Sequence, residues 1–294
     1  MVYYKSLLAL QKNSRLGEGI FWHSEHKKIY WIDIENMEVH RFDPETLAAD
    51  MWNVGKRVGC IVPSANDKIV CALQGEIAEL DLLTGKTKKL LDIEKELPGN
   101  RCNDGNVDLN GRLWIGTMSV NEEQKEKGSL YRIGPDLIAR KMVEKLSISN
   151  GIGWSPNDDE MYLIDTPDKR LLAFRYEAAT GTITNEKRID FFPGTGGFPD
   201  GMCMDTEGML WIAFWGGKRI GRFDPATGDQ LAEVEVPAVN ITSCCFGDDD
   251  LQTLYIITAR QGMSEEELKE YPLSGSIFKC KPGVGGVKMN YFKY

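Results

Sequence analysis

Acidic and amide residues followed closely by glycine recur in front of hydrophobic, strand-like segments of this chain. They are Glu18-Gly19, Asn103-Asp104-Gly105, Asn150-Gly151 and Asp200-Gly201. Carboxylate and side-chain amide oxygens are the ligands that hard divalent cations prefer. If these side chains meet, a cation would also offset the repulsion between Glu18 and Asp200. Each pair alone is equally a common turn signal, so the elements that carry the pairs must decide between a site and a set of turns.

A short pattern recurs six times and places these residues. Each copy has a polar start, a hydrophobic strand, a tight polar turn and a second apolar strand, and the copies begin near Ile20, Ile61, Asn106, Ile152, Met202 and Cys244. Matching residues in the second strand (Trp31, Val70, Trp114, Tyr162, Trp211 and Tyr255) are about 39 to 49 residues apart, which is typical of propeller blades. A third strand, a turn and a fourth strand follow each pair. We therefore predict an all-β protein, with residues 1–294 forming a single six-bladed β-propeller domain.

The propeller brings the polar residues together. The innermost strands of a propeller run side by side along the central channel, so residues just before them converge at one end. Glu18, Asn150 and Asp200 occupy such positions, and we expect them to surround one cation: calcium or magnesium, with manganese or zinc also compatible. Their coincidence at matching repeat positions, more than their residue types, favours a site over three unrelated turns.

Other segments are interpreted structurally. All three histidines, His23, His26 and His40, lie in the first repeat, and we interpret them as solvated residues of turns or strand surfaces. We expect the ring to close by pairing of residues 3–10 with residues 288–291. Charged residues 121–128 are predicted to form an inserted loop, and residues 262–275 a second one with a helical turn or two.

Composition limits the partners and the compartment. The net charge of −9 and the pI near 5.1 argue against binding to nucleic acid or to an anionic membrane. No segment approaches the roughly 18 consecutive apolar residues of a membrane span, and the N-terminal residues lack a signal-peptide pattern. We therefore expect a cytoplasmic protein. The seven cysteines are odd in number and lack C-x-x-C spacing, which favours reduced, mostly buried thiols over disulfides or a zinc cluster.

Collinear motifs resemble those of the regucalcin/gluconolactonase (senescence-marker protein) family. They are Arg101-Cys102-Asn103-Asp104-Gly105, Trp114-Ile115-Gly116-Thr117-Met118, Ser149-Asn150-Gly151, Pro199-Asp200-Gly201-Met202 and Thr242-Ser243-Cys244-Cys245-Phe246-Gly247. The resemblance runs from about Gly17 to Phe278. It implies a six-bladed propeller that hydrolyses sugar lactones with a divalent metal.

The resemblance also implies individual roles. Glu18, Asn150 and Asp200 correspond to metal ligands, Asp200 additionally to the general base, and Arg101 and Asn103 to substrate-binding residues. The family's substrate-contacting glutamate has an ambiguous counterpart within residues 121–123, which leaves the substrate preference open. The implied partner is a small-molecule sugar lactone, and the implied cofactor is one divalent cation, with calcium preferred.

Several properties stay open at this stage. We expect a monomer or a weak oligomer. One alternative function is a phosphotriester or fluorophosphate hydrolase, in which calcium at the same end of the ring would polarise a P=O group. The other is a non-catalytic, calcium-binding regulatory propeller.

Overall fold

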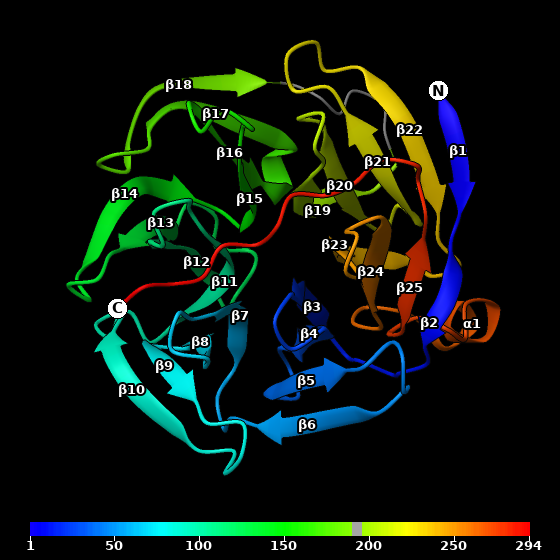
Figure 1. Ribbon diagram of the computed structural model, residues 1–294, viewed down its shortest axis with the longest axis horizontal. Coiled ribbons are helices and arrows are strands. Elements are labelled where there is room, and N and C mark those ends of the chain that lie inside the picture. Colours follow the sequence, from blue (N-terminus) through cyan, green and yellow to red (C-terminus); the bar gives the residue numbers. More distant parts are fainter. Residues whose placement is uncertain (190–195) are drawn as a thin grey trace.

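Six sheets surround a central axis in the computed structural model, which describes residues 1–189 and 196–294 (Figure 1). The predicted six-bladed β-propeller is therefore confirmed. In every blade the first strand of the sequence repeat is the innermost strand, and the following strands lie successively outward.

The first three blades follow the repeat directly. Blade 1 consists of β3 (Gly17–His23), β4 (Lys28–Asp33), β5 (Glu38–Phe42) and β6 (Ala49–Asn53); blade 2 of β7 (Val58–Pro63), β8 (Ile69–Leu73), β9 (Glu76–Leu80) and β10 (Thr87–Asp92); and blade 3 of β11 (Asn100–Val107), β12 (Leu113–Ser119), β13 (Gly128–Ile133) and β14 (Ala139–Leu146).

The remaining blades include the N-terminal strands. Blade 4 consists of β15 (Ser149–Trp154), β16 (Glu160–Asp165), β17 (Arg170–Glu177) and β18 (Thr182–Ile189); blade 5 of β19 (Phe198–Met204), β20 (Leu210–Trp215), β21 (Arg219–Phe223), β22 (Gln230–Glu235) and β1 (Val2–Lys5); and blade 6 of β23 (Asn240–Gly247), β24 (Thr253–Ala259), β25 (Ile277–Cys280) and β2 (Leu7–Leu10). A 3₁₀ helix, η1 (Thr166–Asp168), follows β16, and a short helix, α1 (Glu265–Glu270), follows β24.

The ring closes differently from the sequence-based expectation. Strand β1 lies parallel to β22, and β2 lies antiparallel to β25. The expected pairing of residues 3–10 with residues 288–291 is wrong. The C-terminal segment instead crosses one end of the ring (Figure 1), attached by isolated bridges at Gly286 and Phe292. Phe292 is fully buried in a hydrophobic cluster between blades 2 and 3, and its amide and carbonyl bond to Pro63 and Ala65, so apolar packing and backbone hydrogen bonds together hold this segment.

The six matching residues of the repeat form the centre of the packing between blades. All lie on the second strand of a blade, and each is 3% exposed or less: Trp31, Val70, Trp114, Tyr162, Trp211 and Tyr255. Fully burying a large apolar side chain stabilises the fold by about 1.5–3 kcal/mol. The matching positions of the repeat are therefore those whose side chains fill the space between neighbouring sheets.

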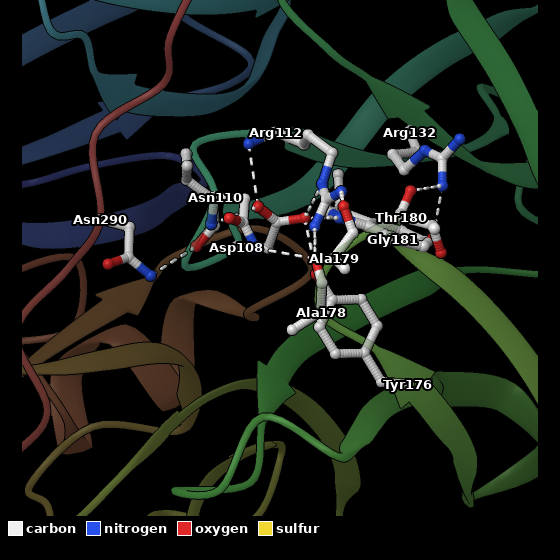
Figure 2. A network of polar contacts seen from close by, with 12 residues as sticks. Asp108, Asn110, Arg112, Arg132, Tyr176, Ala178, Ala179, Thr180, Gly181 and Asn290 are labelled. Carbon is white, nitrogen blue, oxygen red and sulfur yellow. Dashed lines mark hydrogen bonds and ion pairs between the residues drawn. The ribbon is translucent and has the colours of Figure 1, made fainter.

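A buried aspartate joins blades 3 and 4 through a polar network (Figure 2). The Asp108 carboxylate accepts hydrogen bonds from Arg112 Nε over 2.6 Å, Tyr176 Oη over 2.8 Å and Trp114 Nε1 over 3.0 Å. Arg112 also donates to the carbonyl oxygen of Ala178 in blade 4. Asp108 is fully buried, these donors satisfy its carboxylate oxygens, and the network joins the two blades.

The histidines are more buried than expected from the sequence. His23 is 0% exposed and His40 is 6% exposed, so the prediction of solvated positions is wrong for both. The His40 ring stacks on Trp31 with centroids 4.7 Å apart, and burial lowers the pKa of His40 to about 4. The apolar faces of these imidazoles therefore serve as packing surfaces. His26 is half-buried in a turn.

Predictions for the loops and cysteines are confirmed. The segment 262–275 contains α1, whose first turn has a capping box: Ser264 Oγ accepts from the Glu267 amide, and the Glu267 carboxylate accepts from the Ser264 amide. Of the predicted loop 121–128, residues 121–127 lie outside the strands and Gly128 begins β13. All seven cysteines are free thiols, and all except Cys203 are buried. No helix among the described residues is long and apolar enough to cross a bilayer.

Candidate metal and substrate site

The residues selected from the sequence meet in one cavity of about 280 Å³ at the start of the innermost strands. Glu18 comes from β3, Arg101 and Asn103 from β11, Asn150 from β15 and Asp200 from β19. Four blades thus contribute side chains to a single volume. The convergence predicted from the repeat is observed, whereas the chemical roles of the residues stay predictions.

A β-bulge near the start of every innermost strand helps to direct these side chains. The strand register shifts between Glu18 and Phe21, Val58 and Cys60, Cys102 and Gly105, Asn150 and Ile152, Pro199 and Met202, and Ile241 and Ser243. A bulge re-aims the side chains beside it. This recurring irregularity allows residues at the start of each innermost strand to point into the channel.

Two of the glycines that follow the polar residues are required by this local geometry. Gly19 has φ of +55°, a conformation that residues with a Cβ rarely adopt. Gly201 has ordinary backbone angles, but a Cβ there would lie 2.6 Å from Ser243 Oγ and 2.8 Å from the Thr242 carbonyl oxygen. The glycines thus permit both the bend and the close approach of neighbouring blades.

Glu18 and Asp200 form a closely spaced carboxyl pair. Both side chains line the cavity and each influences the ionisation of the other; Asp200 is 5% exposed and Glu18 is half-buried. Burial, followed by the charge of Asp104, raises the pKa of Glu18 to about 8. Burial, followed by the charge of Glu18, raises the pKa of Asp200 well above its usual range. A positive charge between the two carboxyl groups would favour their ionised forms.

Hydrogen bonds to Asn103 of blade 3 and to Thr166 of its own blade orient the Asn150 amide. Its Oδ1 accepts from Asn103 Nδ2 over 3.0 Å, and its Nδ2 donates to Thr166 Oγ1 over 2.8 Å. Thr166 in turn donates to the Pro199 carbonyl oxygen over 2.8 Å. One lone pair of Oδ1 is left for a cation. Two carboxylates and an oriented amide oxygen therefore fit a hard divalent cation, and the chain's own residues would hold it as Glu18, Asn150 and Asp200.

Arg101 supplies positive charge beside these carboxylates. Its guanidinium is buried, and Nη1 donates to the Cys102 carbonyl oxygen over 3.0 Å and to Asn103 Oδ1 over 2.5 Å. Burial lowers the pKa of Arg101, and the negative charges of Glu122 and Glu35 oppose that effect. Arg101 is therefore a fixed donor of hydrogen bonds at the edge of the cavity.

Glu122 differs in position from the other residues of the segment 121–123. It is the residue of these three that lines the cavity, and its charge acts on Arg101. These three residues are all polar and lie in one loop, so the path of the loop, which the sequence does not show, decides which of them lines the cavity.

Two other residues were not assigned a role from the sequence. Gln261 follows β24 and lines the cavity, and its Oε1 is buried without a hydrogen-bond partner among the described residues. Asp104 accepts from the Gly105 amide over 2.7 Å, and its charge contributes to the raised pKa of Glu18. The acidic type and position of Asp104 in the Asn103-Asp104-Gly105 run were a usable signal, whereas Gln261 has no motif around it.

Apolar side chains complete the cavity wall. They are Leu16, Ile34, Met118, Ile148, Pro167, Phe198 and Trp215. A cavity that combines an oxygen cluster and an arginine with apolar surfaces suits a small ligand that has both polar groups and a carbon framework.

Comparison with known proteins assigns the family. The family model for the SMP-30/gluconolactonase/LRE-like region matches residues 16–260, which include all five predicted site residues. The chain therefore belongs to this family.

Similar proteins match along nearly the whole chain. A Bacillus subtilis (strain 168) protein with the provisional name sugar lactone lactonase YvrE is 34% identical over 281 residues, covering 96% of both chains. Regucalcin of Danio rerio is 35% identical over 280 residues, covering 95% of both chains. The crystal structure of regucalcin from Agrobacterium tumefaciens, described as a calcium-binding protein, has a TM-score of 0.93 at 26% identity and full coverage of both chains.

Proposed function

We propose that this chain is a divalent-metal-dependent hydrolase that opens sugar lactones. The observation that carries the proposal is the placement of Glu18, Asn150 and Asp200 beside Arg101 in one cavity. The name of the B. subtilis relative supports a lactone substrate, and the description of the A. tumefaciens regucalcin supports calcium as the cation.

The proposed chemistry needs a polarised carbonyl, an activated water and a proton for the departing ring oxygen. A divalent cation held by Glu18, Asn150 and Asp200 would supply Lewis-acid assistance to the carbonyl and the water. Asp200 accepts a proton as the water oxygen bonds to the carbonyl carbon. The ring C–O bond then breaks, and the same proton passes from Asp200 to the alkoxide, giving a hydroxy acid that ionises in solution.

The other residues bind and orient the lactone in this proposal. Arg101 and Glu122 lie at the cavity edge and can bind carbonyl or hydroxyl groups through charge-assisted hydrogen bonds. Asn103 contacts both Arg101 and Asn150, which couples substrate binding to the orientation of a proposed metal ligand. The apolar wall accommodates the ring carbons.

A lactone panel tests the proposal directly. Protein stripped with a chelator is assayed for proton release from five- and six-membered aldonolactones before and after addition of calcium, magnesium, manganese or zinc. We expect hydrolysis only after a cation is restored. Hydrolysis that survives complete metal removal would contradict the metal-dependent mechanism.

Two further outcomes would support the alternatives. Activity on phosphotriesters with inert lactones would indicate a phosphotriester hydrolase. Stoichiometric calcium binding with no hydrolysis of either class would indicate a non-catalytic regulatory propeller.

A substitution separates catalysis from folding. Asp200→Ala should lower kcat/KM by at least about 100-fold, because both a proposed ligand and the proposed base are lost. The circular dichroism spectrum should be unchanged, because the blades pack through apolar contacts. Asp136→Ala is the control, since Asp136 is exposed and pairs with Arg140 on the surface.

A further inference from the structure

A second group of metal-ligating side chains lies at the end of the ring opposite the cavity. One ligand atom from each of His23, His26 and Asp67 lies within 4.8 Å of the others. His23 is the last residue of β3, the strand whose second residue is Glu18, so the channel separates this cluster from the first site. His26 lies in the turn after β3, and Asp67 lies in the turn between β7 and β8 of the neighbouring blade.

The contacts within the cluster leave one buried imidazole nitrogen unused. His26 Nε2 is 2.7 Å from Asp67 Oδ1, and its Nδ1 is 2.7 Å from Tyr30 Oη. His23 Nδ1 accepts from the His26 amide over 3.2 Å. In the part of the chain that the structure describes, His23 Nε2 has no hydrogen-bond partner although the side chain is fully buried. Leaving a buried polar group unpaired costs about 1–3 kcal/mol, so a partner is expected there.

The residue types identify that partner by class. Two imidazole nitrogens and one carboxylate oxygen are ligands that zinc and similar divalent transition metals prefer, whereas calcium and magnesium prefer oxygen alone. We propose that His23, His26 and Asp67 form a metal site for zinc or a chemically similar divalent cation. This site differs in ligand chemistry from the oxygen-rich cavity at the other end of the ring.

The local structure permits an ion to enter. The imidazole rings are stacked, with centroids 3.6 Å apart and planes inclined by 3°, so the rings must splay for both nitrogens to face one ion. The side chains of His26 and Asp67 are 20% and 72% exposed, and both lie in turns, so they can rotate while His23 stays in place. Metal binding at Nε2 places the proton of His23 on Nδ1, so the hydrogen bond from the His26 amide must break; Tyr291 Oη, 3.4 Å from Nδ1, is then the nearby acceptor of that proton.

Metal binding at this position would tie two blades together. His23 and His26 belong to the first blade and Asp67 to the second, and Tyr291 of the C-terminal segment packs edge-on against His23 with centroids 5.3 Å apart. A ligand that binds only the folded protein raises the free energy of unfolding by RT ln(1 + L/Kd), where L is the free ligand concentration. Zinc should therefore raise the unfolding temperature through this site.

Zinc stoichiometry tests the proposal in the full-length protein. Metal-free wild-type protein and His26→Gln are titrated with zinc by isothermal calorimetry and by competition with a chromogenic chelator. We expect the variant to bind one equivalent less than wild type and to lose the corresponding rise in unfolding temperature. The result is the difference in zinc stoichiometry between wild type and His26→Gln. Zinc bound in the oxygen-rich cavity would contribute equally to both proteins and would not affect this difference.

Three further variants separate this site from the cavity. Asp67→Asn should lower the zinc affinity of this site by at least tenfold. Asp249→Asn should leave that affinity unchanged, because Asp249 is a similarly exposed turn aspartate that pairs with Lys27. Glu18→Gln should still bind the zinc equivalent at this site, and His26→Gln should leave lactone hydrolysis unchanged. Equal zinc stoichiometry and affinity in wild type, His26→Gln and Asp67→Asn would overturn the proposal.

Discussion

Asn103 donates a hydrogen bond from Nδ2 to Oδ1 of Asn150 over 3.0 Å. The same amide nitrogen donates to the Ser149 carbonyl oxygen over 2.8 Å, and Asn103 Oδ1 accepts from Arg101. Both donor hydrogens of Asn103 are thereby engaged within the protein. Asn103 thus links a proposed substrate-binding residue in blade 3 to a proposed metal ligand in blade 4, so it acts first as a positioning residue.

Asn103→Ala should therefore impair metal binding as well as catalysis. Removing a residue that orients a metal ligand typically costs about 10–100-fold in metal affinity or activity. We expect losses of that size in the apparent calcium affinity and in kcat/KM for lactones. Asn106→Ala is the matched control, because Asn106 lies on the same strand but bonds to the Ile152 carbonyl oxygen away from the cavity. A loss in kcat/KM at unchanged metal affinity would instead indicate direct substrate contact alone.

The raised pKa of Glu18 predicts how stability changes with pH. The folded-state pKa is about 8, against a reference value of 4.5, so the folded protein binds this proton more tightly than the unfolded chain. Its contribution to stability is complete below pH 4.5 and is lost as the pH rises through about 8. Without metal, the urea concentration at the unfolding midpoint should decrease as the pH is raised from 5 to 8. Addition of calcium at pH 8 should return the midpoint toward its value at pH 5.

Glu18→Gln provides the control for this pH dependence. The variant cannot ionise at position 18, so its urea midpoint should fall less steeply over the same range. Asp200 shifts in the same direction, so part of the slope should persist. Identical slopes in wild type and Glu18→Gln would contradict the assigned pKa shift.

Gln261 should determine preference among lactones. Gln261 lines the cavity, and its buried Oε1 has no partner among the described residues; rotation of the side chain would offer this acceptor to a substrate hydroxyl. Gln261→Leu should lower kcat/KM for hydroxyl-rich aldonolactones by about 5- to 100-fold, which corresponds to the loss of one buried hydrogen bond. Activity on δ-valerolactone, which lacks hydroxyl groups, should change little. Gln124→Leu, in an exposed turn, is the control, and an equal loss on both substrates would contradict the assignment.

The Asp108 network should contribute strongly to stability. Asp108→Ala leaves the buried Arg112 guanidinium and the hydroxyl of Tyr176 without their acceptor. Breaking a buried ion pair by removing one partner costs about 3–5 kcal/mol. Chemical denaturation should show a decrease of that size in the free energy of unfolding. Asp136→Ala removes the exposed partner of Arg140 and should change stability little, because surface pairs are screened by water.

The blade architecture could be predicted because its main determinants are local. Adjacent strands of a blade are close in sequence, and the residues that fill the space between blades, such as Trp114 and Trp211, recur in each copy. The positions of Glu18, Asn150 and Asp200 then followed from the rule that innermost strands converge. Their common location therefore required no knowledge of individual side-chain contacts.

The unpredicted features depend on contacts between distant segments. Pairing of β2 with β25 joins residues more than 250 positions apart, and nothing in residues 7–10 distinguishes that partner from another strand edge. The burial of His23 depends partly on Tyr291, and the role of Gln261 depends on the path of the chain after β24. Local periodicity carries no information about such encounters.

The outer positions of β1 and β2 have a consequence for biosynthesis. Leu7–Leu10 pairs with Ile277–Cys280, and a ribosome adding about 5–20 residues per second needs roughly 13 to 50 seconds to make the intervening chain. During that interval β2, which contains Leu7 and Leu8, has no partner strand to pair with, because β25 has not yet been synthesised. Blades 1 to 4 can assemble during translation, whereas the circle can be sealed only after the last blade has emerged.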